Sequence, residues 1–372
     1  MKKINVLTKW FVISLTLLLT PLRGYAATID NQALSILDLH RHDSNVKDVK
    51  NFKEFLKEAE NNDPKAQTNV AYCYFYGLGV QQNYDEAEKW LKKAMKNGDE
   101  LAYVNLGMFY LLTNNYNKGL EIIKPLAEKG DPTAQANLGA CYMNGWGVQQ
   151  NFDEALKLLK PAAEKGDPTA QVNLGAYYLM TNNYDEGIKL LKPAAEKGNI
   201  SAQANLGTCY MNGWGVQQNF DEALKLLKPA AERGDQTALT NLSACYMNGW
   251  GVQQNFDEAL KLLKPLSDIG NARALALTAF CHVQKINEAI KDMGTFAMNF
   301  KDSPDANSDE KTKALKEKIF TIDALLNDAK TWYKNIEQQG FKLPTDVQTK
   351  FNGFITEMEK LLKELDINEL KK

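Results

Sequence analysis

Positive charge is not in excess in this sequence of 372 residues, which carries 44 Lys and Arg against 46 Asp and Glu. The first 26 residues hold Lys2, Lys3, Lys9 and Arg23 and no acidic residue, so the remainder has 40 basic against 46 acidic residues and a net charge of −6. A protein that grips phosphate backbones or anionic lipid needs a basic surface. The charge balance therefore argues against a nucleic-acid partner.

Long apolar runs are lacking beyond the N-terminus. Met1–Lys9 is short and basic, Trp10–Leu19 is almost continuously apolar, and Gly24 and Ala26 stand at positions −3 and −1 of a cut after Ala26. This is the layout of a secretory signal peptide, and the apolar stretch is short for a membrane span. No cysteine follows it, which excludes a lipoprotein anchor. We expect residues 1–26 to be cleaved, no transmembrane span in the mature chain, and export to the periplasm or beyond; an uncleaved anchor is the alternative.

Internal repetition dominates the rest of the chain. Segments 132–167 and 200–235 differ at only four positions. In each unit a capped, apolar-periodic helix is followed by a Gly- and Asn-rich loop and a second helix, which in the longer units begins at a pair of the Asn151/Glu154 type. Two short helices cannot bury their apolar faces alone, so the units are expected to stack into an all-α solenoid. Spaced 36, 32, 36, 32, 36 and 36 residues apart, the opening alanines are Ala66, Ala102, Ala134, Ala170, Ala202, Ala238 and Ala274.

The longer units read Tyr-Met-Asn-Gly-Trp-Gly-Val-Gln-Gln-Asn at 142–151, with Ala-Gln-x-Asn-Leu-Gly before and Ala-Ala-Glu-Lys-Gly-Asp after. With these motifs the sequence resembles the Sel1-like repeat, a relative of the tetratricopeptide repeat. The resemblance covers six units over 63–271, with a degenerate seventh at 272–301. It implies an α/α solenoid that acts as a protein–protein adaptor, and for exported bacterial members a partner in the cell envelope or in a host.

The flanks follow other patterns. Residues 27–62 hold two helical patterns that would cap the first repeat, and 302–309 is a polar linker. Within 310–372, apolar residues step alternately by four and three on both sides of Gly340–Pro344, as in heptad seams. The seams predict either an antiparallel helical hairpin that caps the array or a coiled coil that makes a homodimer.

The five cysteines all occupy one equivalent position of the first helix of a unit. Stacked helices lie about 8–10 Å apart, beyond the ~7 Å Cα limit for a disulfide. We therefore expect small buried packing residues. Some Sel1-like proteins pair two cysteines in each unit, and this sequence lacks the second one. The positions are Cys73, Cys141, Cys209, Cys245 and Cys281.

No motif supplies an active site. His40 and His42 point to different faces of a helix, and His282 replaces a repeat tyrosine. Ser308 and Lys311 form a Ser-x-x-Lys motif, but it begins in the linker. The β-lactamase-like or penicillin-binding activity described for some relatives is therefore a remote alternative. We expect no enzyme activity, no metal site and no cofactor.

An asparagine recurs in the middle of the first helix of all six units, where it is disfavoured by about 0.6 kcal/mol relative to alanine. A carboxamide matches the alternating C=O and N–H groups of an extended peptide. The resemblance to peptide-binding tetratricopeptide solenoids places such a ladder in the concave groove. The alternative is that each asparagine bonds the backbone of a neighbouring repeat. The ladder consists of Asn69, Asn105, Asn137, Asn173, Asn205 and Asn241.

Other candidate binding residues flank the ladder or lie in the loops. The loop tryptophans are either packing plugs against Phe152, Phe220 and Phe256 or an exposed row of anchors. The predicted function is an exported, non-enzymatic adaptor that holds a protein or extended peptide in its groove; a structural spacer that homodimerises through 310–372 is the alternative. These further candidates are Tyr72, Tyr76, Met143, Asn144, Met211, Asn212, Trp146, Trp214 and Trp250.

Overall fold

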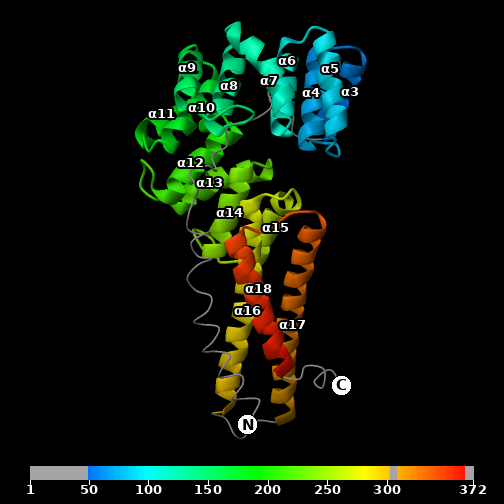
Figure 1. Cartoon of the computed structure of the whole chain (residues 1–372), viewed down its shortest axis with the longest axis vertical. Helices are drawn as coiled ribbons and strands as arrows, with labels where there is room; N and C mark the ends of the chain where they lie inside the picture. Colours follow the sequence, from blue (N-terminus) through cyan, green and yellow to red (C-terminus); the bar gives the residue numbers. More distant parts are fainter. Residues whose placement is uncertain (1–48, 302–307, 365–372) are drawn as a thin grey trace. The chain divides into compact units, whose positions relative to one another are not determined.

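A computed structural model of the protein describes residues 49–301 and 308–364 (Figure 1). The predicted signal peptide, the first helical pattern of 27–62, His40, His42 and most of the 302–309 linker lie outside the described residues. Within the described residues every regular element is a helix, which confirms the all-α prediction. The contacts divide the chain into a repeat unit that ends at residue 238 and a C-terminal unit that begins at residue 239.

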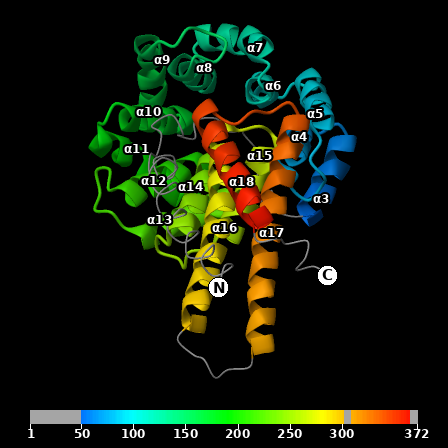
Figure 2. The ribbon, with the colours of Figure 1, turned by 60° about the horizontal axis from the view of Figure 1, so that its bottom comes forward.

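The repeat unit consists of α3 (Val49–Glu60) and five helix pairs, whose first and second members are called helix A and helix B. The helices from α3 to α13 follow one another along an arc (Figure 2). The pairs are α4 (Pro64–Tyr76) and α5 (Tyr84–Lys96), α6 (Glu100–Leu112) and α7 (Tyr116–Glu128), α8 (Pro132–Asn144) and α9 (Phe152–Glu164), α10 (Pro168–Met180) and α11 (Tyr184–Glu196), and α12 (Ile200–Asn212) and α13 (Phe220–Glu232).

Local sequence signals define the helix ends. Asp131 caps α8, because its Oδ1 accepts the N–H of Ala134 at 2.7 Å, and a proline follows at the first helical position. Asn151 caps α9 by accepting the N–H groups of the next first-turn residues. Gly145 ends α8 in the left-handed conformation, with φ of 71°. The helix ends are thus defined by local interactions, because the residues that cap each end lie within a few positions of it in the sequence.

Side chains also join successive repeats. Gln135 in α8 donates to the carbonyl of Ala127 in α7 at 3.2 Å, a carbonyl near the end of the preceding helix B that also accepts the N–H of Gly130 at 3.0 Å. Thr133 donates to Oδ2 of Asp167 at 2.8 Å, and Oδ1 of the same aspartate caps α10. One N-cap carboxylate therefore holds both its own helix and the preceding repeat.

Two loop lengths alternate between helix A and helix B. Three residues join α6 to α7 and α10 to α11, with Asn114 and Asn182 at φ of 61°. Seven residues join α8 to α9, and there Gln150 donates to the carbonyl of Met143 at 2.7 Å, which ties the longer loop to helix A. The seven-residue loop therefore extends further over the helix B of the preceding repeat than the three-residue loop does.

The C-terminal unit contains α15 (Phe256–Asp268), α16 (Ala272–Lys301), α17 (Ser308–Gln338) and α18 (Thr345–Glu364), and α14 (Gln236–Asn248) spans the boundary. Segment 272–301, predicted as a degenerate seventh repeat, is one continuous helix. Cys281 keeps the buried repeat position, but no glycine-rich loop interrupts the chain after it. The repeat pattern therefore ends in a helix about twice the usual length.

Most of the described heptad residues of 310–372 are buried within the chain. Ile322 and Leu326 of α17 and Phe351 and Met358 of α18 are almost fully buried. The predicted hairpin pairs α17 with α18, whereas α17 packs mainly along α16 and α18 lies across both (Figure 1). Similar lengths explain this pairing, because α16 and α17 have 30 and 31 residues and α18 has 20.

Candidate functional site

The six asparagines of the predicted ladder lie inside the protein, with exposed fractions between 0% and 4%. Asn173 Nδ2 donates to the carbonyl of Ala136 at 3.1 Å, which joins the A helices of two neighbouring repeats. This bond is the one that the alternative interpretation predicts. The burial favours a role in repeat packing, and the ladder has no exposed surface to offer a peptide.

Asn137 and Asn173 should respond differently to the same substitution. Within the described chain neither carboxamide atom of Asn137 has a hydrogen-bond partner, whereas Asn173 bonds Ala136. Both changes to alanine remove the same volume, so the difference reports the hydrogen bonds. We expect Asn173→Ala to cost about 1–2 kcal/mol more than Asn137→Ala in urea unfolding, because it breaks a buried hydrogen bond and removes one unbonded buried polar atom, whereas Asn137→Ala breaks none and removes two. Equal losses would show that the Asn173 bond contributes nothing.

The other predicted groove residues are also engaged within the chain. Met143 and Met211 are buried. Asn144 Nδ2 donates to the carbonyl of Ala140 at 2.8 Å, and Asn212 makes the equivalent bond to Thr208 at 2.7 Å. These contacts lie in the last turn of helix A, where a side chain satisfies a carbonyl one turn earlier.

The loop tryptophans are partly buried packing residues. Trp214 stacks on Tyr184, with ring centroids 5.5 Å apart and planes 8° apart. Tyr184 begins α11 of the preceding repeat, a partner that the sequence analysis did not consider. Gly215 allows this approach, since a Cβ there would lie 2.8 Å from Tyr184. Trp146 and Trp250 are likewise partly buried.

Loop length decides which aromatic residue at the start of helix B stays exposed. Tyr116 and Tyr184 are each followed by a long repeat, whose seven-residue loop packs on them through Gly147 and Trp214. Tyr84 and Phe152 are each followed by a short repeat, and they remain 46% and 37% exposed. We call Tyr84 and Phe152 the step aromatics. In the repeat unit helix B begins with Tyr84, Tyr116, Phe152, Tyr184 or Phe220.

Each step aromatic lies beside an aromatic side chain near the end of the next helix A. The ring centroids of Tyr84 and Phe109 are 6.4 Å apart, and those of Phe152 and Tyr177 are 5.9 Å apart. The two pairs occupy equivalent positions one long and one short repeat apart. Neither pair was predicted from the sequence. The signal that locates them is the alternation of 36- and 32-residue spacings, because each pair lies where a long repeat is followed by a short one.

The predicted tyrosines belong to the first of these clusters. Tyr72 is buried and Tyr76 is partly exposed, with ring centroids 4.6 Å apart. Phe75 lies between Tyr76 and Tyr84, at 4.9 and 5.2 Å from them. Tyr76 therefore extends the apolar surface around Tyr84, whereas the buried Tyr72 packs against Tyr76.

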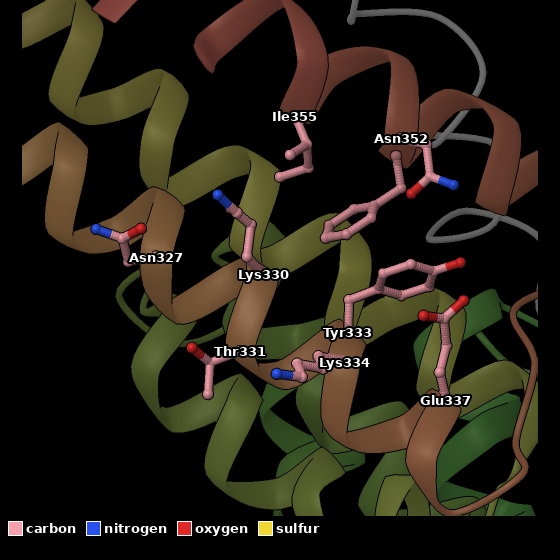
Figure 3. Close-up of a pocket in the computed structure, with 9 residues that line it drawn as sticks. Asn327, Lys330, Thr331, Tyr333, Lys334, Glu337, Asn352 and Ile355 are labelled. Atoms are coloured by element: carbon pink, nitrogen blue, oxygen red, sulfur yellow. The ribbon is translucent and has the colours of Figure 1, made fainter.

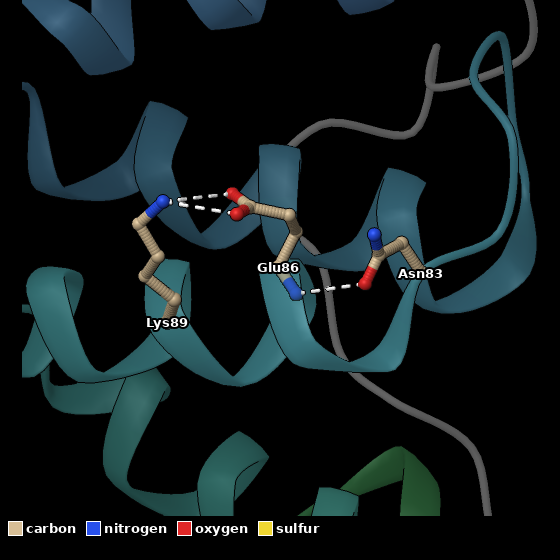
Figure 4. Close-up of polar contacts among 3 residues, drawn as sticks. All are labelled: Asn83, Glu86 and Lys89. Carbon is tan, nitrogen blue, oxygen red and sulfur yellow. Dashed lines mark hydrogen bonds and ion pairs between the residues drawn. The ribbon is translucent and has the colours of Figure 1, made fainter.

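The first turn of helix B makes the edge around the step aromatics acidic. Asn83 caps α5 by accepting the N–H of Glu86 at 3.1 Å, and Glu86 pairs with Lys89 at 2.9 Å (Figure 4). Two carboxylates stand in the first turn of each of α5, α9, α11 and α13. Asp85 and Asp153, next to the step aromatics, are exposed. We call the edge formed by these first turns and the A–B loops the loop edge.

All five cysteines are buried and none of them forms a disulfide, as predicted for packing residues. Burial raises the pKa of Cys141, Cys209 and Cys245 to about 12. Their thiols are therefore protonated at neutral pH and lack the thiolate that nucleophilic or metal-binding chemistry needs.

The described residues hold neither a metal-binding cluster nor a membrane-spanning helix. No group of three or more His, Cys, Asp or Glu side chains in this part of the chain is placed to hold a metal ion. None of the helices described combines the length and apolar character needed to cross a membrane.

A pocket of about 410 Å³ lies between α17 and α18 in the C-terminal unit (Figure 3). Tyr333 and Asn352 line it from opposite helices. Two of its lining residues bond side chains of α18, since Gln348 donates to the Tyr333 hydroxyl at 2.8 Å and Lys330 pairs with Glu359 at 2.5 Å. Burial and a hydrogen bond to Glu337 raise the pKa of Tyr333. These bonds join α17 to α18.

Tandem pairs of 13-residue helices with alternating loops define an α/α solenoid repeat protein. Five segments match the Sel1 repeat model, and this places the chain among the Sel1 repeat proteins, as the sequence predicted. The segment between the first and second matches, 100–131, folds as the equivalent pair α6 and α7. The matched segments are 64–99, 132–167, 168–199, 200–235 and 236–271.

Solved structures of several bacterial proteins are similar to this chain. A Sel1 repeat protein from Oxalobacter formigenes is 28% identical, with 57% of this chain and 95% of that one covered and a TM-score of 0.39. A protective antigen of uropathogenic Escherichia coli strains, with an SLR fold, is 24% identical, with 84% and 70% covered and a TM-score of 0.37. No curated protein matches the sequence significantly.

Proposed function

We propose that the protein is an exported, non-enzymatic scaffold that binds a partner protein through the loop edge of its Sel1 repeats. Sel1 repeat proteins generally mediate protein–protein interaction and are typically non-enzymatic. The observation that carries the proposal is the exposure of Tyr84 and Phe152 at the start of two B helices, where the loop of a following long repeat is missing, in a unit whose A helices are mostly buried. Exposed aromatic side chains on a rigid edge are the usual anchors of protein interfaces.

The loop edge replaces the asparagine groove as the proposed contact surface. The six asparagines, Met143 and Met211 are buried, so a partner gains no contact with them without opening the repeats. Tyr76, Tyr84 and Phe152 need no such opening. The expected partner is still a protein, as the sequence predicts, but it would contact the loop edge instead of the asparagine groove.

Binding is tested by capture with the purified protein. We expect immobilised 27–372, incubated with envelope and extracellular fractions of the source cells, to retain a defined protein that then binds saturably when purified. A folded protein of similar size and net charge is the control for ionic capture. Recovery of the same proteins on both supports would contradict the scaffold function.

The alternatives have separate readouts. Light scattering over a concentration series tests the spacer that homodimerises through 310–372, and a monomer at all concentrations removes it. Hydrolysis of a chromogenic β-lactam that Ser308→Ala abolishes would favour the β-lactamase-like alternative and contradict a non-enzymatic scaffold.

Export is supported by the basic, apolar and small-residue segments of 1–26. Expression of the whole sequence in a Gram-negative host is expected to yield a periplasmic or released product whose intact mass corresponds to a chain beginning at Ala27. A product that keeps residues 1–26, or that stays in the cytoplasm, would contradict this part of the proposal.

A further inference from the structure

We infer that Tyr84 and Phe152 form a docking surface for a basic segment of the partner, in which each aromatic ring receives an arginine side chain. The inference rests on the proposed scaffold function and names the chemistry of its partner. At the same helix position, Tyr116 and Tyr184 are covered by the loop of the following long repeat. The exposure of the step aromatics therefore follows from the order of long and short repeats, and it recurs at both long-to-short steps of the repeat unit.

The ring geometry leaves room for a side chain. Phe109 meets Tyr84 with ring planes 73° apart, and Tyr177 meets Phe152 at 58°. Tilted neighbours of this kind support a ring from the side without covering it, and 46% of Tyr84 and 37% of Phe152 remain exposed. A guanidinium or ammonium group within about 6 Å of such a ring is attracted by the negative charge of the ring face.

The surrounding charge selects a basic occupant. Glu86 pairs with Lys89, and Glu154 pairs with Lys157 at 2.5 Å, so these carboxylates are already partly neutralised. Asp85 and Asp153 directly follow the step aromatics and are exposed. The helix dipole accounts for carboxylates in a first turn but not for an exposed ring beside them. A carboxylate next to an aromatic surface fits the guanidinium group, which pairs with one and stacks on the other.

The two sites favour an extended occupant. Both lie in one compact unit, one long and one short repeat apart, so their separation is set by the stacking of the helices between them. A segment that engages the first site brings its next arginine to the second at high effective concentration. We therefore expect a flexible basic strand to bind more tightly than a single arginine.

The test is fluorescence anisotropy with the chain 27–372 and a labelled peptide of alternating arginine and serine; a peptide with glutamate in place of arginine is the charge control. We expect Tyr84→Ala and Phe152→Ala each to weaken binding of the arginine peptide about tenfold, and the double variant more. Asp153→Asn is expected to weaken it about threefold. Tyr103→Ala is the matched control, since this tyrosine is 42% exposed near the start of α6, far from the loop edge, and its loss should change binding less than about twofold.

A second pair of variants separates ring chemistry from apolar area. Tyr84→Leu and Phe152→Leu keep an apolar side chain but lose the ring, and they are expected to weaken binding nearly as much as the alanine variants. Circular dichroism verifies that each variant is folded. Full binding by the leucine variants would overturn the role of the rings.

Other outcomes overturn the inference without touching the scaffold function. They are absence of arginine-peptide binding at about 1 mM, equal binding of the glutamate peptide, or unchanged binding by Tyr84→Ala and Phe152→Ala. Equal capture of a partner by the wild type and by these variants would agree with the scaffold function. It would show that the partner does not bind through Tyr84 and Phe152. Self-association that both substitutions abolish would make a second copy of the chain the occupant, and it too would overturn the basic-segment assignment.

Discussion

Replacing Gly187 with alanine is expected to destabilise the repeat unit by about 2 kcal/mol, although the long repeats carry alanine at the equivalent position. Gly187 lies in α11, where an added Cβ would lie 2.7 Å from Leu179 Cδ2 and 3.0 Å from the carbonyl oxygen of Gly175. The backbone oxygen cannot rotate away as a side chain can. The clash therefore outweighs the gain in helix propensity of about 1 kcal/mol that alanine brings.

The short loop explains why glycine is needed here. Gly119 repeats the arrangement in the other short unit, with Leu111 at 2.7 Å and the Gly107 carbonyl at 3.0 Å from an added Cβ. The long units keep Ala155 and Ala223 at this position, and both are fully buried without a glycine. A three-residue loop thus comes with a tighter crossing of helix A and helix B than a seven-residue loop.

Urea unfolding followed by circular dichroism measures this effect. We expect Gly119→Ala and Gly187→Ala together to cost about 4 kcal/mol, because the sites are two repeats apart and do not share neighbours. Gly353→Ala in α18 is the control, since no atom lies within 4 Å of its added Cβ, and it should stabilise the chain by up to about 1 kcal/mol. If Gly187→Ala behaves like Gly353→Ala, the close crossing is absent in solution.

His282 is expected to make the C-terminal unit sensitive to acid. Burial, and then the positive charge of Lys285, lower its pKa from 6.5 to about 4, and Asp328 opposes the shift. The imidazole lies 5.3 Å from the Trp332 ring, between centroids, and Lys285 pairs with Asp257 at 2.6 Å. The folded protein thus holds His282 neutral where the unfolded chain is protonated.

The direction of the pH effect follows from this difference. Above pH 6.5 the imidazole is neutral in both states and contributes nothing to the pH dependence. Between pH 6.5 and about 4 the unfolded state binds the additional proton, so the free energy of unfolding falls as the pH falls. The loss levels off below about pH 4, where it reaches about 3 kcal/mol.

His282→Tyr isolates this contribution from that of the many carboxylates. It introduces the residue that the repeats hold at the same position, as at Tyr142 and Tyr246, and it cannot take up a proton. In urea unfolding above pH 6.5 and near pH 4, the wild type should lose about 3 kcal/mol more than the variant. Parallel pH profiles of the two proteins would refute the buried, neutral histidine.

The sequence by itself determined the repeat architecture, because its signals are local. Asp-Pro N-caps, left-handed glycines and an apolar stripe each act within a few residues, so the helix pairs and their family follow from the pattern. The buried position of the cysteines was also predictable, since repetition at one helix position marks a packing residue. Most of the heptad positions of 310–372 that the structure describes are buried, whereas Leu315 and Tyr333 are only partly buried.

Only the tertiary structure decided what each repeated residue faces. The spacing that placed the asparagines on a groove stripe says nothing of how closely successive A helices pack, and the packing buries them. The pairing of α17 with α16 depends on contacts between distant segments. The same holds for Trp214, which covers Tyr184 of another repeat, and for Tyr84 and Phe152, which no loop covers. Exposure in a solenoid is a property of neighbouring repeats, and a single repeat's sequence does not contain it.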